Sequence, residues 1–205
     1  MGMSRFSMPM PSGGRHLDAL AGPLAALRAD VPRIDLWGRR LASVLTGGGR
    51  LLAVGNGGSA AQASHLTAEI VGRYRDDRRP YSAIALCAES SAFTAIVNDY
   101  GPEEVFARQV RAHGRPGDVL VAMSTSGASP NVLAAVDAAE EAGMATWGFC
   151  GPRDSPLARR CDDVLSVDSP HTATVQEVHL IGIHLLCAAF DSALAAGGAG
   201  LEVAS

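Results

Sequence analysis

The chain has 205 residues, 47% of them hydrophobic, which suffices for one compact domain and leaves too little sequence for two full ones. Its formal net charge of −4 argues against a nucleic-acid-binding protein that works through a basic face. All 17 basic residues are arginine, so mechanisms that need a Schiff-base, pyridoxal-phosphate or Walker lysine are excluded.

Neither the cysteines nor the apolar segments indicate an exported or membrane protein. The four cysteines lack the paired spacing of zinc fingers or disulfide frameworks, and no signal-peptide pattern opens the chain. The longest apolar run, Leu180–Phe190, is interrupted by His184 and is shorter than the ~20 residues of a membrane span. We therefore expect a cytoplasmic protein without a membrane or nucleic-acid partner.

The two ends of the chain differ in composition from the part between them. Residues 1–16 are rich in Met, Ser, Pro and Gly, and we expect them to be flexible, like the tail at 196–205. A single domain is expected over residues 17–195. It begins with two helices, Leu17–Ala29 and Ile34–Leu45, in which apolar residues recur three and four positions apart.

From residue 51 onward, short apolar runs alternate with helical patterns. Continuous apolar strands separated by helices are typical of a parallel sheet that is covered on both faces. The sequence therefore predicts an α/β fold, a three-layer αβα sandwich with a parallel sheet and two additional N-terminal helices. The predicted strands are Leu51–Gly55, Ser82–Cys87, Val119–Met123, Ala145–Cys150 and Asp163–Val167, and the predicted helices are Ser59–Val71, Ser90–Asn98, Glu103–His113, Pro130–Ala142 and Val175–Leu194.

The turn after the first strand reads Gly55-Asn56-Gly57-Gly58-Ser59. Glycines allow a ligand to approach the backbone, and the amino terminus of the next helix directs unpaired N–H groups toward an anion. For the glycines alone, a plain tight turn is the simpler interpretation.

The turn after the third strand reads Ser124-Thr125-Ser126-Gly127-Ala128-Ser129. Hydroxyls at the carboxyl end of a parallel strand can hold a phosphate without any cation. One hydroxyl suffices to cap the next helix, whereas this turn has four. Two such turns in one sheet favour a phosphorylated ligand.

Three polar side chains have spacings that suit metal ligands. His65 and Glu69 lie four positions apart on one helix face, although an exposed pair of this kind is more often a solvated surface feature. His184 interrupts an apolar run, where a lone histidine is more often a hydrogen-bonded core residue. The residues alone leave these alternatives open.

Five motifs follow one another in the chain: Gly55-Asn56-Gly57-Gly58-Ser59, His65-x-x-x-Glu69, Asn98-Asp99, Ser124-Thr125-Ser126-Gly127 and Gln176-Glu177-x-His179-x-x-x-x-His184. This ordered set resembles the phosphoheptose isomerases, which are enzymes of the sugar-isomerase (SIS) domain type with a flavodoxin-like or Rossmann-like sheet. The resemblance extends from about Leu17 to Asp191. Each motif is weak by itself, and the ordered set is highly specific.

The resemblance implies a zinc site and an adjoining sugar-phosphate site. The Zn²⁺ ligands it implies are His65, Glu69, Gln176 and His184. The substrate contacts it implies are Asn56, Gly57, Gly58, Glu69, Asn98, Asp99, Ser124, Thr125, Ser126, Ser129 and Gln176, with the hydroxyl-rich turn holding the phosphate.

The implied reaction converts D-sedoheptulose 7-phosphate to D-glycero-D-manno-heptose 7-phosphate in heptose biosynthesis, through an enediol. A carboxylate suits the proton transfer between C1 and C2, and zinc or an imidazole suits the carbonyl charge. We therefore assign Glu69 as the proton carrier and His184 as the acid and base near the oxygens. Since a metal-bound carboxylate is a weaker base, Glu69 would need a long metal bond or a ligand shift during turnover.

The sequence departs from the family pattern at two places. Gln62 stands where the family often has Asp, and His171-Thr172-Ala173-Thr174 stands where it often has Asp-Thr-Ala-Arg. The loss of an arginine at position 174 is expected to alter how the substrate is held. Neither departure removes an implied zinc ligand or catalytic residue.

Three other kinds of SIS protein compete with this interpretation. Non-catalytic relatives that bind a replication initiator typically lack the carboxylate and the final histidine, which are present here as Glu69 and His184. A regulatory domain that senses sugar phosphates would accompany a DNA-binding domain, for which residues 1–16 leave no room. Amino-sugar isomerases of this type resemble lysine-using enzymes, and the absence of lysine from this chain counts against them.

The resemblance also implies a homotetramer with active sites at subunit contacts. Gln176 and His184 are eight residues apart, or ~12 Å along a straight helix, whereas zinc ligands lie ~2.0–2.2 Å from the metal. The side chains can just meet if the histidine leans back toward the amino terminus. Otherwise Gln176 precedes the regular helix, or a neighbouring chain supplies one ligand. The final helix is apolar nearly all round, and either a second subunit or the chain's own sheet and N-terminal helices would cover it.

Overall fold

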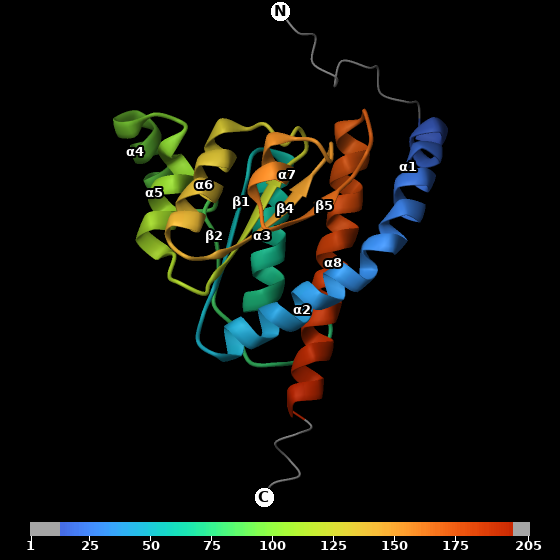
Figure 1. Ribbon diagram of the computed structural model, residues 1–205, viewed down its shortest axis with the longest axis horizontal. Helices are drawn as coiled ribbons and strands as arrows, with labels where there is room; N and C mark the ends of the chain where they lie inside the picture. The colour runs from blue at the N-terminus through green and yellow to red at the C-terminus, as the bar shows by residue number, and fades with distance from the viewer. Residues whose placement is uncertain (1–12, 199–205) are drawn as a thin grey trace, which may run out of the picture.

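The computed structural model describes residues 13–198, which form one parallel sheet with helices on both faces (Figure 1). The elements in chain order are α1 (Gly13–Leu27), the 3₁₀ turn η1 (Arg28–Asp30), α2 (Val31–Thr46), β1 (Leu51–Gly55), α3 (Gly58–Val71), β2 (Ala83–Ala85), α4 (Ser90–Tyr100), α5 (Glu104–His113), β3 (Val119–Ser124), α6 (Pro130–Glu141), β4 (Ala145–Cys150), α7 (Pro156–Arg160), β5 (Asp163–Ser166) and α8 (Thr172–Gly198).

The sheet has the strand order β2-β1-β3-β4-β5, and every neighbouring pair is parallel. This is the doubly wound order in which the chain first moves to one side of β1 and then returns to the other side. The predicted αβα sandwich with a parallel sheet is therefore confirmed. β2 is shorter than the predicted strand at 82–87, and the five-residue helix α7 was not predicted because it spans too few residues to show a helical period.

Alternate residues of the strands fill two separate cores. In β3, Val119, Val121 and Met123 face the layer of α1, α2, α3 and α8. Leu120 and Ala122 face the opposite layer of α4, α5, α6 and α7. Figure 1 shows α4, α5 and α6 gathered on one side of the sheet, with α1, α2 and α8 on the other. Strands buried on both faces explain why no polar alternation appears in the sequence.

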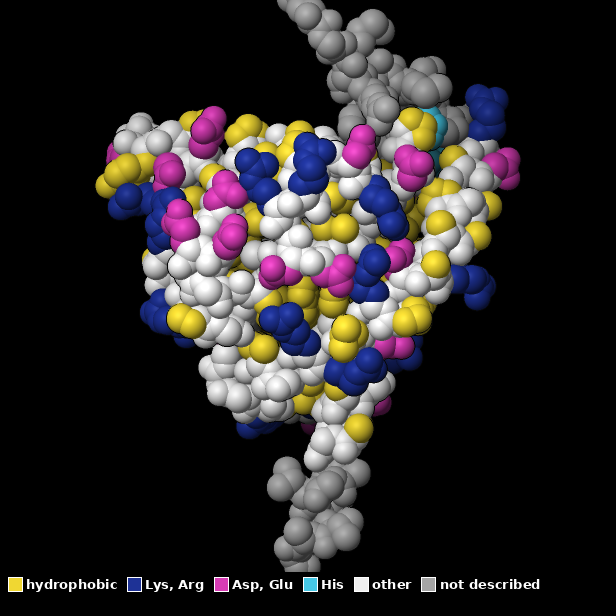
Figure 2. All heavy atoms as spheres, in the orientation of Figure 1, with side chains coloured by type: hydrophobic (Ala, Val, Ile, Leu, Met, Phe, Trp, Pro, Cys, Tyr) yellow, Lys and Arg dark blue, Asp and Glu magenta, His cyan; other side chains and the backbone are white. Residues whose placement is uncertain are grey.

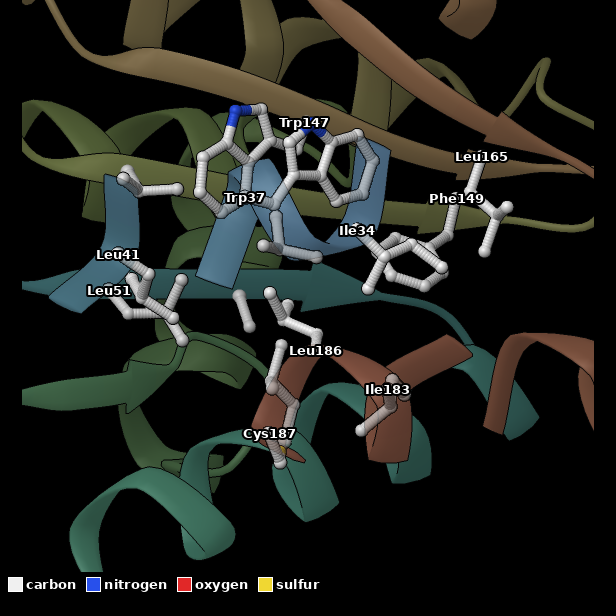
Figure 3. Close-up of a cluster of buried hydrophobic side chains, with 14 of the residues drawn as sticks. Ile34, Trp37, Leu41, Leu51, Trp147, Phe149, Leu165, Ile183, Leu186 and Cys187 are labelled. Atoms are coloured by element: carbon white, nitrogen blue, oxygen red, sulfur yellow. The ribbon is translucent and has the colours of Figure 1, made fainter. Parts of the chain in front are cut away.

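The two tryptophans of the chain fasten α2 to the sheet. Trp37 stacks on Trp147 of β4 with ring centroids 5.0 Å apart and planes 5° from parallel (Figure 3). The Trp37 Nε1–H donates to Asp163 Oδ2 at 2.8 Å, so its polar end is satisfied inside the core. Arg33 of the same helix pairs with Asp163 and donates to the Val164 carbonyl at 2.7 Å.

The expected boundaries of the domain shift by a few residues at both ends. Residues 13–16, expected to be flexible, form the first turn of α1, and residues 196–198 belong to α8. The remaining parts of the two expected flexible segments, 1–12 and 199–205, lie outside the described residues.

The final helix α8 is long and apolar, and by length and composition alone its segment Thr172–Gly197 could cross a membrane. Core helices of soluble proteins pass the same test. Ile183, Leu186 and Phe190 of α8 are fully buried against α2, α3 and the sheet (Figure 3 labels the first two). In the most apolar stretch of α8, 28% of the residues are fully buried within this chain, many of the others are half-buried, and Ile181 is 37% exposed.

Charged side chains of both signs are mixed on the face of the molecule in Figure 2, without a continuous basic stripe. Apolar side chains gather along α1 at the right edge of the same view, where Leu17 is 69% exposed. The mixture of charges agrees with the small net charge of −4.

The helices that follow β1 and β3 cover opposite faces of the sheet. α3 packs Ala63 and Leu66 into the core shared with α2 and α8, whereas α6 packs Val132 and Ala135 into the other core. The chain therefore leaves the carboxyl ends of these two neighbouring strands in opposite directions. Ligands of open α/β sheets bind in the crevice that such a divergence creates.

Candidate active site

The glycine turn lies at the end of β1 and leads directly into α3. Gly57 has φ +53°, a backbone conformation that favours glycine, and it occupies the N-cap position of the helix. Gly58 lies so close to the side-chain amide of Gln176 that a Cβ there would collide with it. The turn is thus built for close approach between α3 and the start of α8.

The hydroxyl-rich turn at the end of β3 holds its own serines together. Ser124 Oγ lies 3.0 Å from Ser129 Oγ and 3.4 Å from Ser126 Oγ, and it accepts the Gly127 N–H at 3.1 Å. Ser129 occupies the N-cap position of α6, yet its side chain makes no cap hydrogen bond. The serine hydroxyls therefore bond to one another and not to the first N–H groups of α6. They form a cluster beside the amino terminus of α6, where an anion is favoured. Thr125 is half-buried in the same turn.

A reciprocal amide pair joins the two turns. Asn56 Nδ2 donates to Asn131 Oδ1, and Asn131 Nδ2 donates to Asn56 Oδ1, both at 2.9 Å. Asn131, in the first turn of α6, was not expected from the sequence, since one asparagine after a proline gives no signal of a partner 75 positions away. The structure therefore adds Asn131 to the residues that shape this crevice.

The implied metal ligands His65 and His184 meet between α3 and α8. Their Nε2 atoms lie 3.0 Å apart, and Glu69 Oε1 lies 3.4 Å from His65 Nε2. Donor atoms ~2.1 Å from a tetrahedral zinc ion lie ~3.4 Å from one another, so these separations and the mixed nitrogen and oxygen donors fit zinc. Among residues 13–198, no three His, Cys, Asp or Glu side chains converge on one preformed metal-binding point; His65 contacts both Glu69 and His184.

Aromatic stacking fixes the imidazole of His184 on its other side. The ring of Tyr74 stacks on His184 with centroids 5.6 Å apart and planes 28° from parallel. The guanidinium of Arg75 lies over the same tyrosine ring at 5.0 Å. His184 is therefore half-buried between Tyr74 and His65, and its hydrogen bond goes to the His65 imidazole.

Gln176 lies in the regular helix α8, two turns before His184, so the possibility that it precedes the helix is excluded. Its side-chain amide packs against Gly58, and its backbone carbonyl accepts from Gln62 Nε2 at 2.5 Å. Of the four implied metal ligands, the structure therefore brings together His65, Glu69 and His184. Gln176 lies beside the glycine turn.

Asn98 and Asp99 lie near the end of α4, where Asn98 Nδ2 donates to Asp99 Oδ1 at 2.9 Å. Within the described residues, neither forms a hydrogen bond with the two turns. A cleft of about 250 Å³ instead connects the glycine turn to the start of α4, where Ser90, Phe93 and Thr94 line it. The structure therefore joins the two turns to each other and His65 to His184, and among the described residues it gives Asn98 and Asp99 no hydrogen bond to either group.

The two departures from the family pattern leave buried polar atoms without partners among the described residues. These atoms are Gln62 Oε1, His171 Nδ1 and Thr174 Oγ1. Thr174 is fully buried at the start of α8, so it cannot act as an exposed arginine would.

Comparison with known proteins shows the family of the chain. The family model of the SIS domain matches residues 23–151. The chain is 61% identical to the phosphoheptose isomerase of Streptomyces coelicolor over 92% of this chain and 82% of that protein. Its fold is similar to solved phosphoheptose isomerases of Neisseria gonorrhoeae (TM-score 0.80, 39% identity) and Francisella tularensis (TM-score 0.82, 31% identity), each covering 87% of this chain and 96% of that chain. The chain is therefore an isomerase that belongs to the SIS-domain family and, within it, to the phosphoheptose isomerases.

Proposed function

We propose that this protein converts D-sedoheptulose 7-phosphate to D-glycero-D-manno-heptose 7-phosphate, as a zinc-dependent step of heptose biosynthesis. The observation that carries the proposal is the contact of His65 with Glu69 and His184 between α3 and α8, where α3 is the helix that leaves the glycine turn. The names of the relatives support a heptose-phosphate substrate.

The phosphate would bind at the turn of Ser124, Thr125, Ser126 and Ser129, where hydroxyls and the amino terminus of α6 favour an anion. The Asn56–Asn131 pair keeps this turn at a fixed distance from Gly57 and Gly58. The sugar chain would then extend from the phosphate toward Glu69. In this arrangement Gln176, Asn98 and Asp99 remain proposed contacts to the sugar.

The chemistry needs one proton carrier for carbon and one for oxygen. Glu69 would take a proton from C1 of the ketose and return it to C2 of the enediol, while His184 would move a proton from O1 to O2. When bound by His65, Glu69 and His184, zinc would polarise the carbonyl. Gln176, whose side chain packs against Gly58, would have to turn toward them to serve as the proposed fourth ligand. The side chain of Glu69 is 19% exposed, so its carboxylate is shielded from most of the solvent that would compete for the transferred proton.

A turnover assay on D-sedoheptulose 7-phosphate tests the proposal, with purified protein, with a chelator, and after Zn²⁺ is added back. We expect the chelator to abolish turnover and zinc to restore it. The variant Glu69→Gln should lower kcat at least ~100-fold, since it removes the proton carrier and keeps the shape. The matched control is Glu177→Gln, because Glu177 pairs with His16 on the surface and should leave kcat unchanged.

The result that would overturn the proposal is zinc-loaded protein that is folded and inactive on this substrate. If such protein instead bound a replication-initiator protein, the non-catalytic alternative would be correct.

We also infer a cytoplasmic homotetramer whose active sites lie at subunit contacts. The support is the incomplete burial of the apolar helix α8 together with exposed Leu17, Leu36 and Ile181. A groove of about 710 Å³ lies between α2 and the end of α8, and a second chain would fill it. Neither a membrane nor a nucleic acid is proposed as a partner.

A further inference from the structure

A single arginine in the segment after α3 connects the two helices that carry the candidate catalytic residues. The Arg78 side chain is only 11% exposed. It donates from Nη2 to the Glu69 carbonyl at 2.6 Å and from Nη1 to the Ile70 carbonyl at 2.9 Å. Its Nε donates to Asp191 Oδ1 of α8 at 2.8 Å.

The position of this guanidinium suits the end of α3. The last carbonyls of a helix lack partners within the helix, and a cation there also interacts favourably with the helix dipole. Arg78 satisfies two of these carbonyls, one of which belongs to Glu69 itself. The rings of Phe190 and Tyr81 lie 5.1 and 5.6 Å from its guanidinium carbon, so the side chain is packed into one orientation.

The contact between His65 and His184 lies between two polar links that join α3 to α8. At the start of the helices, Gln62 Nε2 donates to the Gln176 carbonyl at 2.5 Å. At the other end, Arg78 joins the Glu69 carbonyl to Asp191, which lies seven residues and two turns after His184. The two helices therefore cannot slide or spread at His65 and His184 unless one of these links breaks.

We propose that Arg78 is a positioning residue, which fixes the spacing of α3 and α8 and so holds His65 and Glu69 opposite His184. The proposal rests on the function proposed above. Lysine cannot replace Arg78, because a single ammonium group lacks the planar fork that reaches two carbonyls and a carboxylate at once.

The variants Arg78→Lys and Asp191→Asn test the proposal in the full-length protein. For each we would measure zinc affinity by competition with a chromophoric chelator, kcat and KM on the sugar phosphate, and the thermal midpoint. Loss of a residue that orients metal ligands typically costs ~10–100-fold in metal affinity or activity. We expect Arg78→Lys to lower zinc affinity and kcat at least ~10-fold and to leave KM within about twofold, because the phosphate turn is untouched.

Asp191→Asn keeps an acceptor for Arg78 without its charge, and it should fold even if Arg78→Lys does not. We expect Asp191→Asn to lower zinc affinity and kcat, by a smaller factor than Arg78→Lys does. The matched control is Arg33→Lys. Arg33 also pairs with carboxylates and donates to a backbone carbonyl, but it links α2 to β5. The variant Arg33→Lys should lower the thermal midpoint and leave zinc affinity and kcat unchanged.

Failure of the positioning role and failure of the proposed function give different results. A wild type that turns over the substrate and binds zinc, with Arg78→Lys and Asp191→Asn equal to it in both, overturns the positioning role alone. A wild type that neither turns over the substrate nor binds zinc overturns the proposed function. If the Arg33 control loses kcat and zinc affinity as strongly as Arg78→Lys, the effect is general destabilisation and the positioning role is wrong.

Discussion

At the scale of single residues, two histidines on α8 show how position decides role. His179 is fully buried, and its Nε2 lies 3.1 Å from the Cys150 carbonyl. His184, five residues later, faces His65 and the ring of Tyr74. The interpretation as a core histidine, which the sequence left open for His184, therefore applies to His179.

Burial lowers the pKa of His179 to about 4, although its hydrogen bond to the Cys150 carbonyl acts in the opposite direction. The unfolded chain binds this proton near pH 6.5, so the stability that the neutral ring contributes is present above pH 6.5 and is lost as the pH falls toward 4. We expect the free energy of unfolding to decrease by up to ~3 kcal/mol over that range from this group. Urea titrations at several pH values measure it.

The control for that titration is His179→Gln, which keeps a donor for the Cys150 carbonyl and does not titrate. The difference in unfolding free energy between wild type and variant isolates His179 from the other histidines. A difference that stays constant between pH 4 and 6.5 would contradict the assignment.

Ser126 provides the residue-scale test of the phosphate turn. A hydrogen bond to a charged group contributes about 1.5–3 kcal/mol, so Ser126→Ala should raise KM for the sugar phosphate at least ~10-fold. The exposed Ser43 on α2 lies away from this turn, and Ser43→Ala should leave KM unchanged. If the two variants have equal KM values, the phosphate binds elsewhere.

At the scale of elements, α2 and α8 cross where neither helix has a bulky side chain. A Cβ added to Gly38 of α2 would lie 2.7 Å from the backbone carbon of Ala189 and 2.8 Å from the backbone nitrogen of Phe190. Backbone atoms cannot move aside as a flexible side chain does, so this glycine sets how closely the two helices approach.

We therefore expect Gly38→Ala to destabilise the protein. Overpacking costs about 1–3 kcal/mol, which exceeds the gain of up to ~1 kcal/mol that alanine brings to a helix. Gly14 of α1 has open space at its Cβ position, so Gly14→Ala should be neutral or stabilising. Thermal unfolding of the two variants gives the comparison, and a higher midpoint for Gly38→Ala would show that α2 and α8 can separate without cost.

At the scale of the whole molecule, the prediction concerns assembly. Because the apolar helix α8 is only partly buried within one chain, we expect light scattering to find a species of about four chains rather than a 21.1 kDa monomer. Dilution should reduce the specific activity as the assembly dissociates. A 21.1 kDa species with full turnover would contradict the shared site.

The sequence alone predicted the αβα architecture because buried parallel strands and amphipathic helices leave different periods in it. It also located the two turns for which we propose anion binding, since glycines and clustered hydroxyls are local signals that do not depend on the rest of the fold. It missed α7, whose five residues are shorter than two helical turns.

The tertiary structure decided which of the singled-out residues meet. The Nε2 atoms of His65 and His184 come together across 119 positions of sequence, while Asn98 and Asp99 contact each other and not the two turns. The links made by Asn131 and Arg78 follow from helix packing, which no local pattern encodes. Periodicity and turn composition are properties of short segments and can be read from the chain, whereas these contacts depend on the distances between packed helices, which only the folded molecule sets.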